Sequence, residues 1–338
     1  MTLLALLLFV RLAPEPGAPP LRQPQMAMQG RTVLLTYGAA DRIYFTSSTD
    51  DGRTFRPPVV VASGRKILLG SHRGPRVAAA SGAIVISAVE GDLLSWRSMD
   101  EGKTWSAAAT INDAPASARE GLHAMVSDGA RRLFAVWLDL RQPGTRLYGA
   151  VSTDGGASWS TNTLVYESPG GSICQCCHPT ARMTASGETY VLFRNSVGGA
   201  RDLYLTKSTD AGKTFGPAQK LGDGTWLLEA CPMDGGDLSL DSSGLPTTVW
   251  RRMSQVFLAR PSESERKIGP GKNPALAAGI AAWSDGLAIK ALIPGKPEPI
   301  TLDDHGAFVQ LLPMGDAAAL AAWESDGAIE VTALPPAR

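Results

Sequence analysis

Cysteine and histidine are scarce in this chain, whose 338 residues include only four of each. So few thiols exclude a small, disulfide-dense scaffold in which bridges replace a hydrophobic core. An excess of charge of one sign is also missing, because 32 Lys and Arg balance 32 Asp and Glu. With this balance, the composition gives no excess of positive charge that would attract nucleic acid or an anionic membrane. Neither partner is therefore expected.

Apolar runs long enough to cross a bilayer are missing too, so no transmembrane span is expected. The short run Leu3–Val10 precedes a Pro-rich stretch and resembles the end of a secretory signal, without the usual basic first segment. We interpret residues 1–20 as signal-like or as a segment that closes the fold, and residues 21–338 as one domain. An extracytoplasmic location, periplasmic or secreted, and a monomeric state are expected.

What the chain does contain is one repeated turn. The pattern Ser-x-Asp-x-Gly-x-Thr/Ser-aromatic follows four strand-like runs, at intervals of about fifty residues. The Asp side chain can accept backbone N–H bonds and Gly supplies a positive φ, so each copy predicts a hairpin turn between two strands. The copies are Ser48–Phe55, Ser98–Trp105, Ser152–Trp159 and Ser208–Phe215.

These turns resemble the Asp boxes, or BNR repeats, of the sialidase (neuraminidase) superfamily and of other propellers that share them. The resemblance implies an all-β fold, a β-propeller of sialidase-like type. Counting strands favours seven blades, with the similar segments 281–286 and 321–327 as second strands of the last two. Six blades, the number in true sialidases, is the alternative, because the last two units are short. The final unit lacks an obvious fourth strand, which an N-terminal segment could supply.

Chemistry-bearing residues gather where each inner strand of the propeller begins. Several of these lead-in segments contain a proline, as at Pro75, Pro179 and Pro232. Such segments reach the central axis, so residues at equivalent positions of different blades are expected to meet at one mouth of the channel. Every Cys and His lies at or just before a lead-in segment: His72, His123, Cys174, Cys176, Cys177, His178, Cys231 and His305.

The densest piece is Cys174-Gln175-Cys176-Cys177-His178. Thiolates and imidazoles are ligands for soft or borderline ions, and we expect copper first and zinc second. Met233, close to Cys231, could add a thioether. The competing interpretation is two disulfides, for example one that joins the cluster to Cys231, since an even Cys count in an exported protein permits this without any metal.

Sialidase chemistry is the other hypothesis. His72-Arg73-Gly74-Pro75 resembles the motif that carries the first substrate-binding arginine of that family, which makes Arg73 a weak catalytic candidate. The family places its tyrosine nucleophile near the end of the fold, whereas the last Tyr here is Tyr204. Glu120 and Asp234 are weak carboxylate candidates for glycoside hydrolysis. Four arginines that end second strands are expected to be solvated or salt-bridged rim residues: Arg141, Arg194, Arg251 and Arg252.

Three functions therefore stay open. The leading one is an extracytoplasmic binding protein that holds a metal ion, a small molecule or a glycan at the propeller mouth. The second is a glycoside hydrolase, a divergent exo-alpha-sialidase. The third is an interaction scaffold with disulfide-braced loops. Whether the chain is an enzyme is left undecided.

Overall fold

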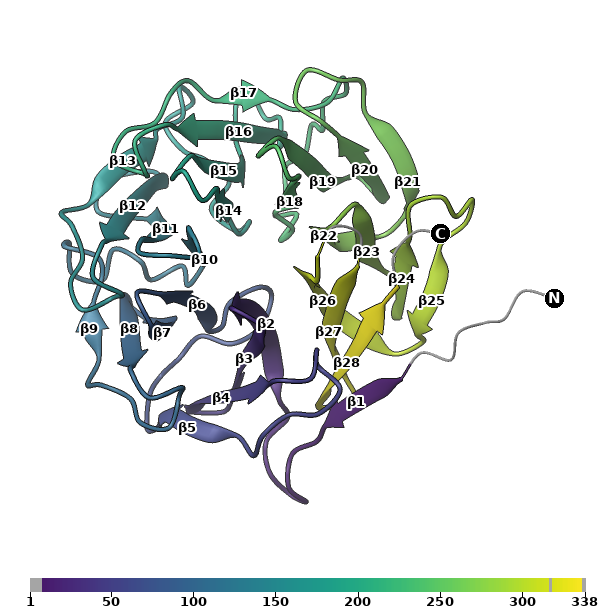
Figure 1. The fold of residues 1–338 in the computed structure, drawn as a ribbon. Coiled ribbons are helices and arrows are strands. Elements are labelled where there is room, and N and C mark those ends of the chain that lie inside the picture. The colour runs from purple at the N-terminus through teal and green to yellow at the C-terminus, as the bar shows by residue number, and fades with distance from the viewer. Residues whose placement is uncertain (1–7, 316–317, 336–338) are drawn as a thin grey trace.

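Seven four-stranded antiparallel sheets surround a central axis in the computed structural model, which describes residues 8–315 and 318–335 (Figure 1). No helix occurs among these residues. The structure confirms the all-β, seven-bladed propeller and excludes the six-bladed alternative.

Each of the first six blades uses four consecutive strands, from the channel outward. Blade one contains β2 (Arg22–Gln29), β3 (Thr32–Ala39), β4 (Arg42–Ser48) and β5 (Val59–Ala62). Blade two contains β6 (Arg76–Ala80), β7 (Ala83–Glu90), β8 (Asp92–Ser98) and β9 (Ala109–Thr110). Blade three contains β10 (His123–Ser127), β11 (Leu133–Asp139), β12 (Arg146–Ser152) and β13 (Thr163–Tyr166). Blade four contains β14 (Thr180–Met183), β15 (Thr189–Arg194), β16 (Leu203–Ser208) and β17 (Gln219–Lys220).

The remaining blades keep the same plan. Blade five contains β18 (Asp237–Leu240), β19 (Pro246–Arg252), β20 (Gln255–Ala259) and β21 (Arg266–Pro270). Blade six contains β22 (Lys272–Ala277), β23 (Ile280–Asp285), β24 (Ala288–Leu292) and β25 (Ile300–Asp303). Blade seven contains β26 (Gly306–Pro313), β27 (Ala319–Ser325) and β28 (Ala328–Leu334).

The fourth strand of blade seven comes from the other end of the chain. Strand β1 (Phe9–Leu12) pairs antiparallel with β28, with Phe9 opposite Thr332 and Leu12 opposite Ile329. Figure 1 shows this purple strand beside the yellow end of the chain. The ring is closed by this pairing, which joins the first and last parts of the chain. Residues 1–7, on which most of the signal-like interpretation falls, lie outside the described residues.

The second strand of each blade provides much of the core. Strands β11 and β27 are buried over their whole length. Trp283 and Trp323, from the two similar segments noted in the sequence, are 1% and 0% exposed. Each buried indole N–H finds an acceptor, Pro270 O at 2.7 Å and Asp303 Oδ2 at 2.6 Å. The sheets can therefore pack face to face without leaving these donors unpaired.

All four Asp boxes form the same turn. In the second copy, the Ser98 hydroxyl donates to Asp100 Oδ1 at 2.8 Å, and Asp100 accepts from Thr104 N–H at 2.9 Å and from Thr104 Oγ1 at 2.6 Å. Gly102 has φ +84°, and a Cβ there would lie 2.1 Å from the ring of Phe45 on the preceding blade. The glycine thus serves both the turn and the packing between blades.

The Asp boxes should make the protein sensitive to acid. Hydrogen bonds from Thr104 and then Ser98 lower the pKa of Asp100 from 3.8 to about 2. A pKa that is lower in the folded state adds stability above the unfolded value, and this stability is lost as the pH falls from about 4 toward 2. We expect Asp100→Asn to lower the melting temperature at pH 7 and to reduce its further fall between pH 4 and pH 2. Thermal unfolding followed by circular dichroism checks this, and parallel curves for the two proteins would contradict it.

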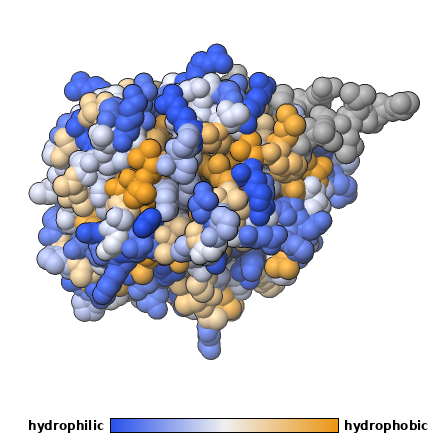
Figure 2. All heavy atoms as spheres, turned by 90° about the horizontal axis from the view of Figure 1, so that it is seen from below, coloured by the Kyte–Doolittle hydropathy of each residue, from blue (hydrophilic) through white to orange (hydrophobic). Residues whose placement is uncertain are grey.

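The side of the rim that Figure 2 shows is mixed in polarity. Figure 2 views the disc edge-on and shows hydrophobic side chains in small groups among hydrophilic ones. None of the described residues belongs to a helix long and apolar enough to cross a membrane.

Candidate functional site

The loop between β13 and β14 carries the densest group of candidate residues. Two backbone bonds attach this loop to neighbouring segments of the fold: Ile173 N–H donates to Thr145 O at 3.0 Å, and Cys174 N–H donates to Arg194 O at 3.1 Å. Ile173 is also buried in the hydrophobic core of blades three and four. The cysteines therefore project from a backbone that is held in place.

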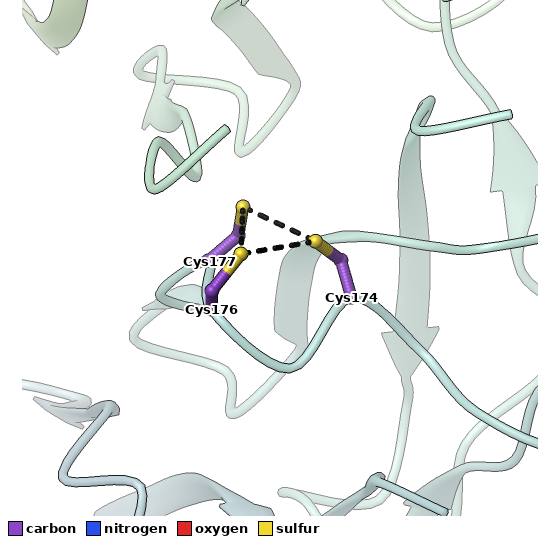
Figure 3. A group of neighbouring side chains, drawn as sticks. All are labelled: Cys174, Cys176 and Cys177. Carbon is purple, nitrogen blue, oxygen red and sulfur yellow. Dashed lines mark hydrogen bonds between the residues drawn. The ribbon is translucent and has the colours of Figure 1, made fainter. Parts of the chain in front are cut away.

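Three thiols of this loop point toward one another (Figure 3). Cys174 Sγ lies 3.4 Å from Cys177 Sγ and 3.6 Å from Cys176 Sγ, and the last two are 4.0 Å apart. Cys174 and Cys177 are each 2% exposed. Within residues 8–315 and 318–335, this is the one group of three or more Cys, His, Asp or Glu whose ligand atoms all lie within 4.8 Å.

The fourth thiol approaches from the next blade. Cys231 lies on the segment that leads into β18 and is exposed, and interaction with Cys176 raises the pKa of the Cys231 thiol. All four cysteines are free in the structure. A disulfide needs a sulfur–sulfur distance of about 2.05 Å, well below the separations in the group of three.

Hydrogen bonding and burial divide the charge unevenly among the thiols. Bonds from Cys176 and then Cys177 lower the pKa of Cys174, and the Arg201 guanidinium lowers it further. Burial raises the pKa of Cys177 well above its ordinary value, against the opposing charge of Arg194. The pKa values of the two buried thiols are therefore shifted in opposite directions.

Arg194 lies next to the cysteine loop, because its backbone carbonyl accepts the hydrogen bond from Cys174 N–H. Its side chain is 1% exposed, and its guanidinium donates to four backbone carbonyls. The guanidinium also lies 5.3 Å from the ring of Trp226, as does that of Arg251 on the blade-five side. The rim interpretation was therefore wrong for Arg194, because the loops of blade five fold over the end of β15. The four acceptors are Asp234 O, Gly235 O, Arg201 O and Arg251 O.

The other strand-ending arginines are salt-bridged, as expected for rim residues. Arg141 pairs with Asp139 and Asp113 at 2.8 Å. Arg252 pairs with Glu265. Arg251 donates to backbone carbonyls and comes within 4.0 Å of Asp234.

Two histidines contact each other at the central channel, where both line the cavity between the inner strands. The rings of His72 and His178 stack with centroids 4.0 Å apart, and His72 Nε2 lies 3.0 Å from Asn273 Oδ1. Phe308 meets the His72 ring edge-on at 5.2 Å. Burial lowers the pKa of both histidines, which favours neutral rings. Both rings line a channel cavity of about 340 Å³ between the inner strands.

The remaining histidines lie apart from the thiols. His123 begins β10 and is fully buried, with Nε2 2.9 Å from Ser87 Oγ of the neighbouring blade. His305 is exposed on the turn before β26, where its N–H donates to Asp303 Oδ1. Among the described residues, the structure thus brings three of the four cysteines together and pairs His72 with His178, but it does not add Cys231 or any histidine to the group of three thiols.

The weak catalytic candidates are engaged in structural contacts. Arg73 Nε donates to Glu120 O at 2.6 Å, and the two side chains come within 3.7 Å. Asp234 is fully buried and accepts from Asn273 N–H at 2.8 Å, while its other oxygen has no partner among the described residues. These contacts position the lead-in loops of several blades against one another.

Comparison with protein families matches residues 87–223 to the BNR repeat-like domain. The chain has a seven-bladed β-propeller fold of sialidase-like type, and the BNR repeat-like match covers its middle part. Comparison with curated protein sequences gives no match.

Solved structures share the fold at low identity. An alpha-L-arabinofuranosidase, Arb93A from Fusarium graminearum, is 13% identical, with 97% of each chain covered and a TM-score of 0.57. The Hadza microbial sialidase Hz136 is 17% identical over 96% of this chain and 67% of its own, with a TM-score of 0.56. The intramolecular trans-sialidase from Ruminococcus gnavus is 12% identical over 93% of this chain and 94% of its own, with a TM-score of 0.56.

Sequence reasoning missed two partners of the histidine pair and the role of Arg194. Asn273 and Phe308 lie near the start of the inner strands β22 and β26, with positive φ values of 52° and 54°. Their position beside inner strands was the available signal, since polar and aromatic side chains at equivalent places meet on the axis. Nothing local in the sequence distinguishes Arg194 from the other arginines that end second strands.

Proposed function

We propose that this propeller is an extracytoplasmic binding protein that holds one soft metal ion on Cys174, Cys176 and Cys177. Copper(I) is the first choice and zinc the second. The ion would lie at the mouth of the central channel, beside the stacked histidines. The fold and the match of residues 87–223 support a propeller with BNR-type repeats, whereas the ion and the location are our proposal.

The spacing of the sulfur atoms carries the proposal. Thiolates bound at about 2.3 Å to a tetrahedral ion lie about 3.8 Å from one another. The three separations here, 3.4, 3.6 and 4.0 Å, bracket that value. The three sulfur atoms could therefore bind one ion together without a large movement of the loop that carries them.

The donor set and its surroundings favour copper(I). Thiolates select copper(I) and zinc, and zinc in structural sites takes four ligands. Three thiols lie in mutual reach, and among the described residues Cys231, whose pKa is raised by Cys176, is the candidate for a fourth ligand. Arg194 and Arg201 act on Cys177 and Cys174 as positive charges, which offset the negative charge of several thiolates.

The arginine contacts give less support to the glycoside hydrolase hypothesis. A sialidase needs arginines free to bind the substrate carboxylate in a bidentate manner. Here Arg73, Arg194 and Arg251 each donate to a backbone carbonyl of a lead-in loop. Using them on a substrate would require these loops to rearrange.

Metal stoichiometry tests the proposal. Reduced protein that is loaded with copper(I) under anaerobic conditions and then desalted is expected to retain one ion per chain. Elemental analysis gives the metal content, and thiol titration before and after loading shows protection of three thiols. Loading with zinc in parallel ranks the two ions. Fully reduced protein that retains no ion would contradict the proposal and leave the scaffold hypothesis.

A further inference from the structure

The central channel contains a cavity that the metal proposal does not use. This cavity, of about 340 Å³, is lined along the inner strands of the blades. It extends from His72 and His178, which precede inner strands, to Met183 and Pro313, the last residues of β14 and β26. None of the three clustered cysteines lines it. The cavity has the volume of a small-molecule site and can be filled separately from the thiols.

Arg76 brings a buried positive charge to this cavity. It is the first residue of β6, is 8% exposed and belongs to the lining. Its Nη2 donates to His72 O at 2.6 Å, and its Nη1 donates to Pro75 O at 3.0 Å and to Gly74 O at 3.2 Å. These bonds hold the guanidinium in place and leave Nε–H without an acceptor among the described residues.

Arg76 has no acidic partner among the described residues. Burial lowers the pKa of Arg76 to about 10, and no neighbouring carboxylate opposes this effect. Backbone carbonyls offer only partial negative charge, and a buried ion without a counter-ion costs free energy. A bound anion would therefore stabilise this part of the channel.

The other charged side chains of the lining neutralise each other. Arg182 Nη2 donates to Asp237 Oδ1 at 2.9 Å, and this ion pair accounts for both residues. The two histidines are the remaining ionisable residues of the lining, and an imidazole supplies no negative charge. The positive charge of Arg76 is therefore left over in the cavity.

We propose that the channel binds a small organic acid with one carboxylate group, which pairs with Arg76. Arginine and a carboxylate form charge-assisted hydrogen bonds, and Nε–H is available for one of them. A halide ion would match the charge but would leave most of the cavity unfilled. The rest of the acid has an apolar surface to contact, because the inner strands line the cavity with Val77, Ala124, Ala181, Ala275 and Leu311.

Benzoate and benzamide test the proposal, since they share a ring and differ in charge. Metal-free, reduced protein is used, so that no ion on the cysteines can attract the carboxylate. Calorimetric titration at pH 7 is expected to show one benzoate bound per chain and at least roughly tenfold weaker binding of benzamide, the effect of losing one bond between charged groups. Equal binding of the two, or no binding of benzoate, overturns the proposal. Nitrate that binds as tightly as benzoate overturns the organic acid and indicates an inorganic anion.

Two variants test the role of Arg76. Arg76→Met is expected to weaken benzoate binding at least roughly tenfold, because it removes the charged donor. Arg97→Met is the matched control, since Arg97 lies on β8 of the same blade and donates to Gly155 O at 2.9 Å but does not line the cavity. The control is expected to keep wild-type affinity. Wild-type affinity in the Arg76→Met protein would overturn the assignment.

The wild-type protein covers the case in which Arg76→Met fails to fold. A crystal structure with 4-bromobenzoate, located by the anomalous scattering of bromine, is expected to show the carboxylate against Arg76 and the bromine inside the channel. Bromine found only beside the cysteines or on the outer surface would overturn the site. Failure to bind copper(I) would overturn the metal proposal alone, so the two failures are distinguishable.

Discussion

Replacing Cys177 by Ser is expected to weaken copper(I) binding roughly 100-fold or more, since even the loss of groups that only support a ligand costs about 10–100-fold in affinity. Cys177 Sγ lies within 4.0 Å of both other sulfur atoms and is 2% exposed. A serine hydroxyl would leave two soft ligands and a harder oxygen, which copper(I) binds poorly. Competition against a chromophoric copper(I) chelator, with reduced protein, measures the change.

Two further variants complete this test. His305→Ala is the matched control, because His305 lies on a lead-in turn but is exposed and apart from the thiols, and its affinity is expected to equal that of the wild type. Cys231→Ser should weaken zinc binding more than copper(I) binding, since zinc requires a fourth ligand. Wild-type affinity in the Cys177→Ser protein would show that the ion, if any, binds elsewhere.

The propeller and the grouping of thiols follow from sequence for the same physical reason. An Asp box is a local turn whose residues specify its geometry, so four copies reveal the period of the blades. Once the period is known, residues just before inner strands must approach one axis. His72 and His178 are 106 residues apart in the sequence, and their rings stack with centroids 4.0 Å apart.

The same rule does not give the direction of a side chain. His123 and His305 also lie at lead-in segments, yet one enters the face between two blades and the other stays on an exposed turn. A difference of one or two residues along the segment changes whether a side chain faces the axis, a neighbouring sheet or solvent. The expected Cys and His cluster therefore separates into a thiol group, a histidine pair and two isolated histidines.

The position of Arg194 depends on contacts between blades that no local pattern records. Its neighbours come from Arg201 on its own blade and from 234–235 and Arg251 on the next. The sequence places an arginine at the end of a second strand, where water is the usual partner. Arg194 is buried because the blade-five loop covers it and supplies carbonyl acceptors for its guanidinium.

Replacing Arg194 by Met is expected to lower the free energy of unfolding by roughly 3–5 kcal/mol, because each buried acceptor left without a partner costs about 1–3 kcal/mol. Methionine keeps much of the volume but cannot donate to Asp234 O, Gly235 O or Arg251 O. The loop is also expected to loosen, because Arg194 O is the acceptor for Cys174 N–H. Chemical denaturation measures the stability, and copper(I) affinity measured below the unfolding transition reports on the thiols.

Arg251→Met is the matched control for this loss. Both guanidiniums lie 5.3 Å from Trp226, but Arg251 has a side chain that is 23% exposed and donates to fewer carbonyls. It is expected to cost about 1 kcal/mol, the usual contribution of a partly exposed hydrogen bond. Arg194→Lys should remain strongly destabilised, since an ammonium group cannot span carbonyls that a planar guanidinium reaches together. Equal losses for Arg194→Met and Arg251→Met would mean that contact with Trp226, and not the buried carbonyls, accounts for the effect.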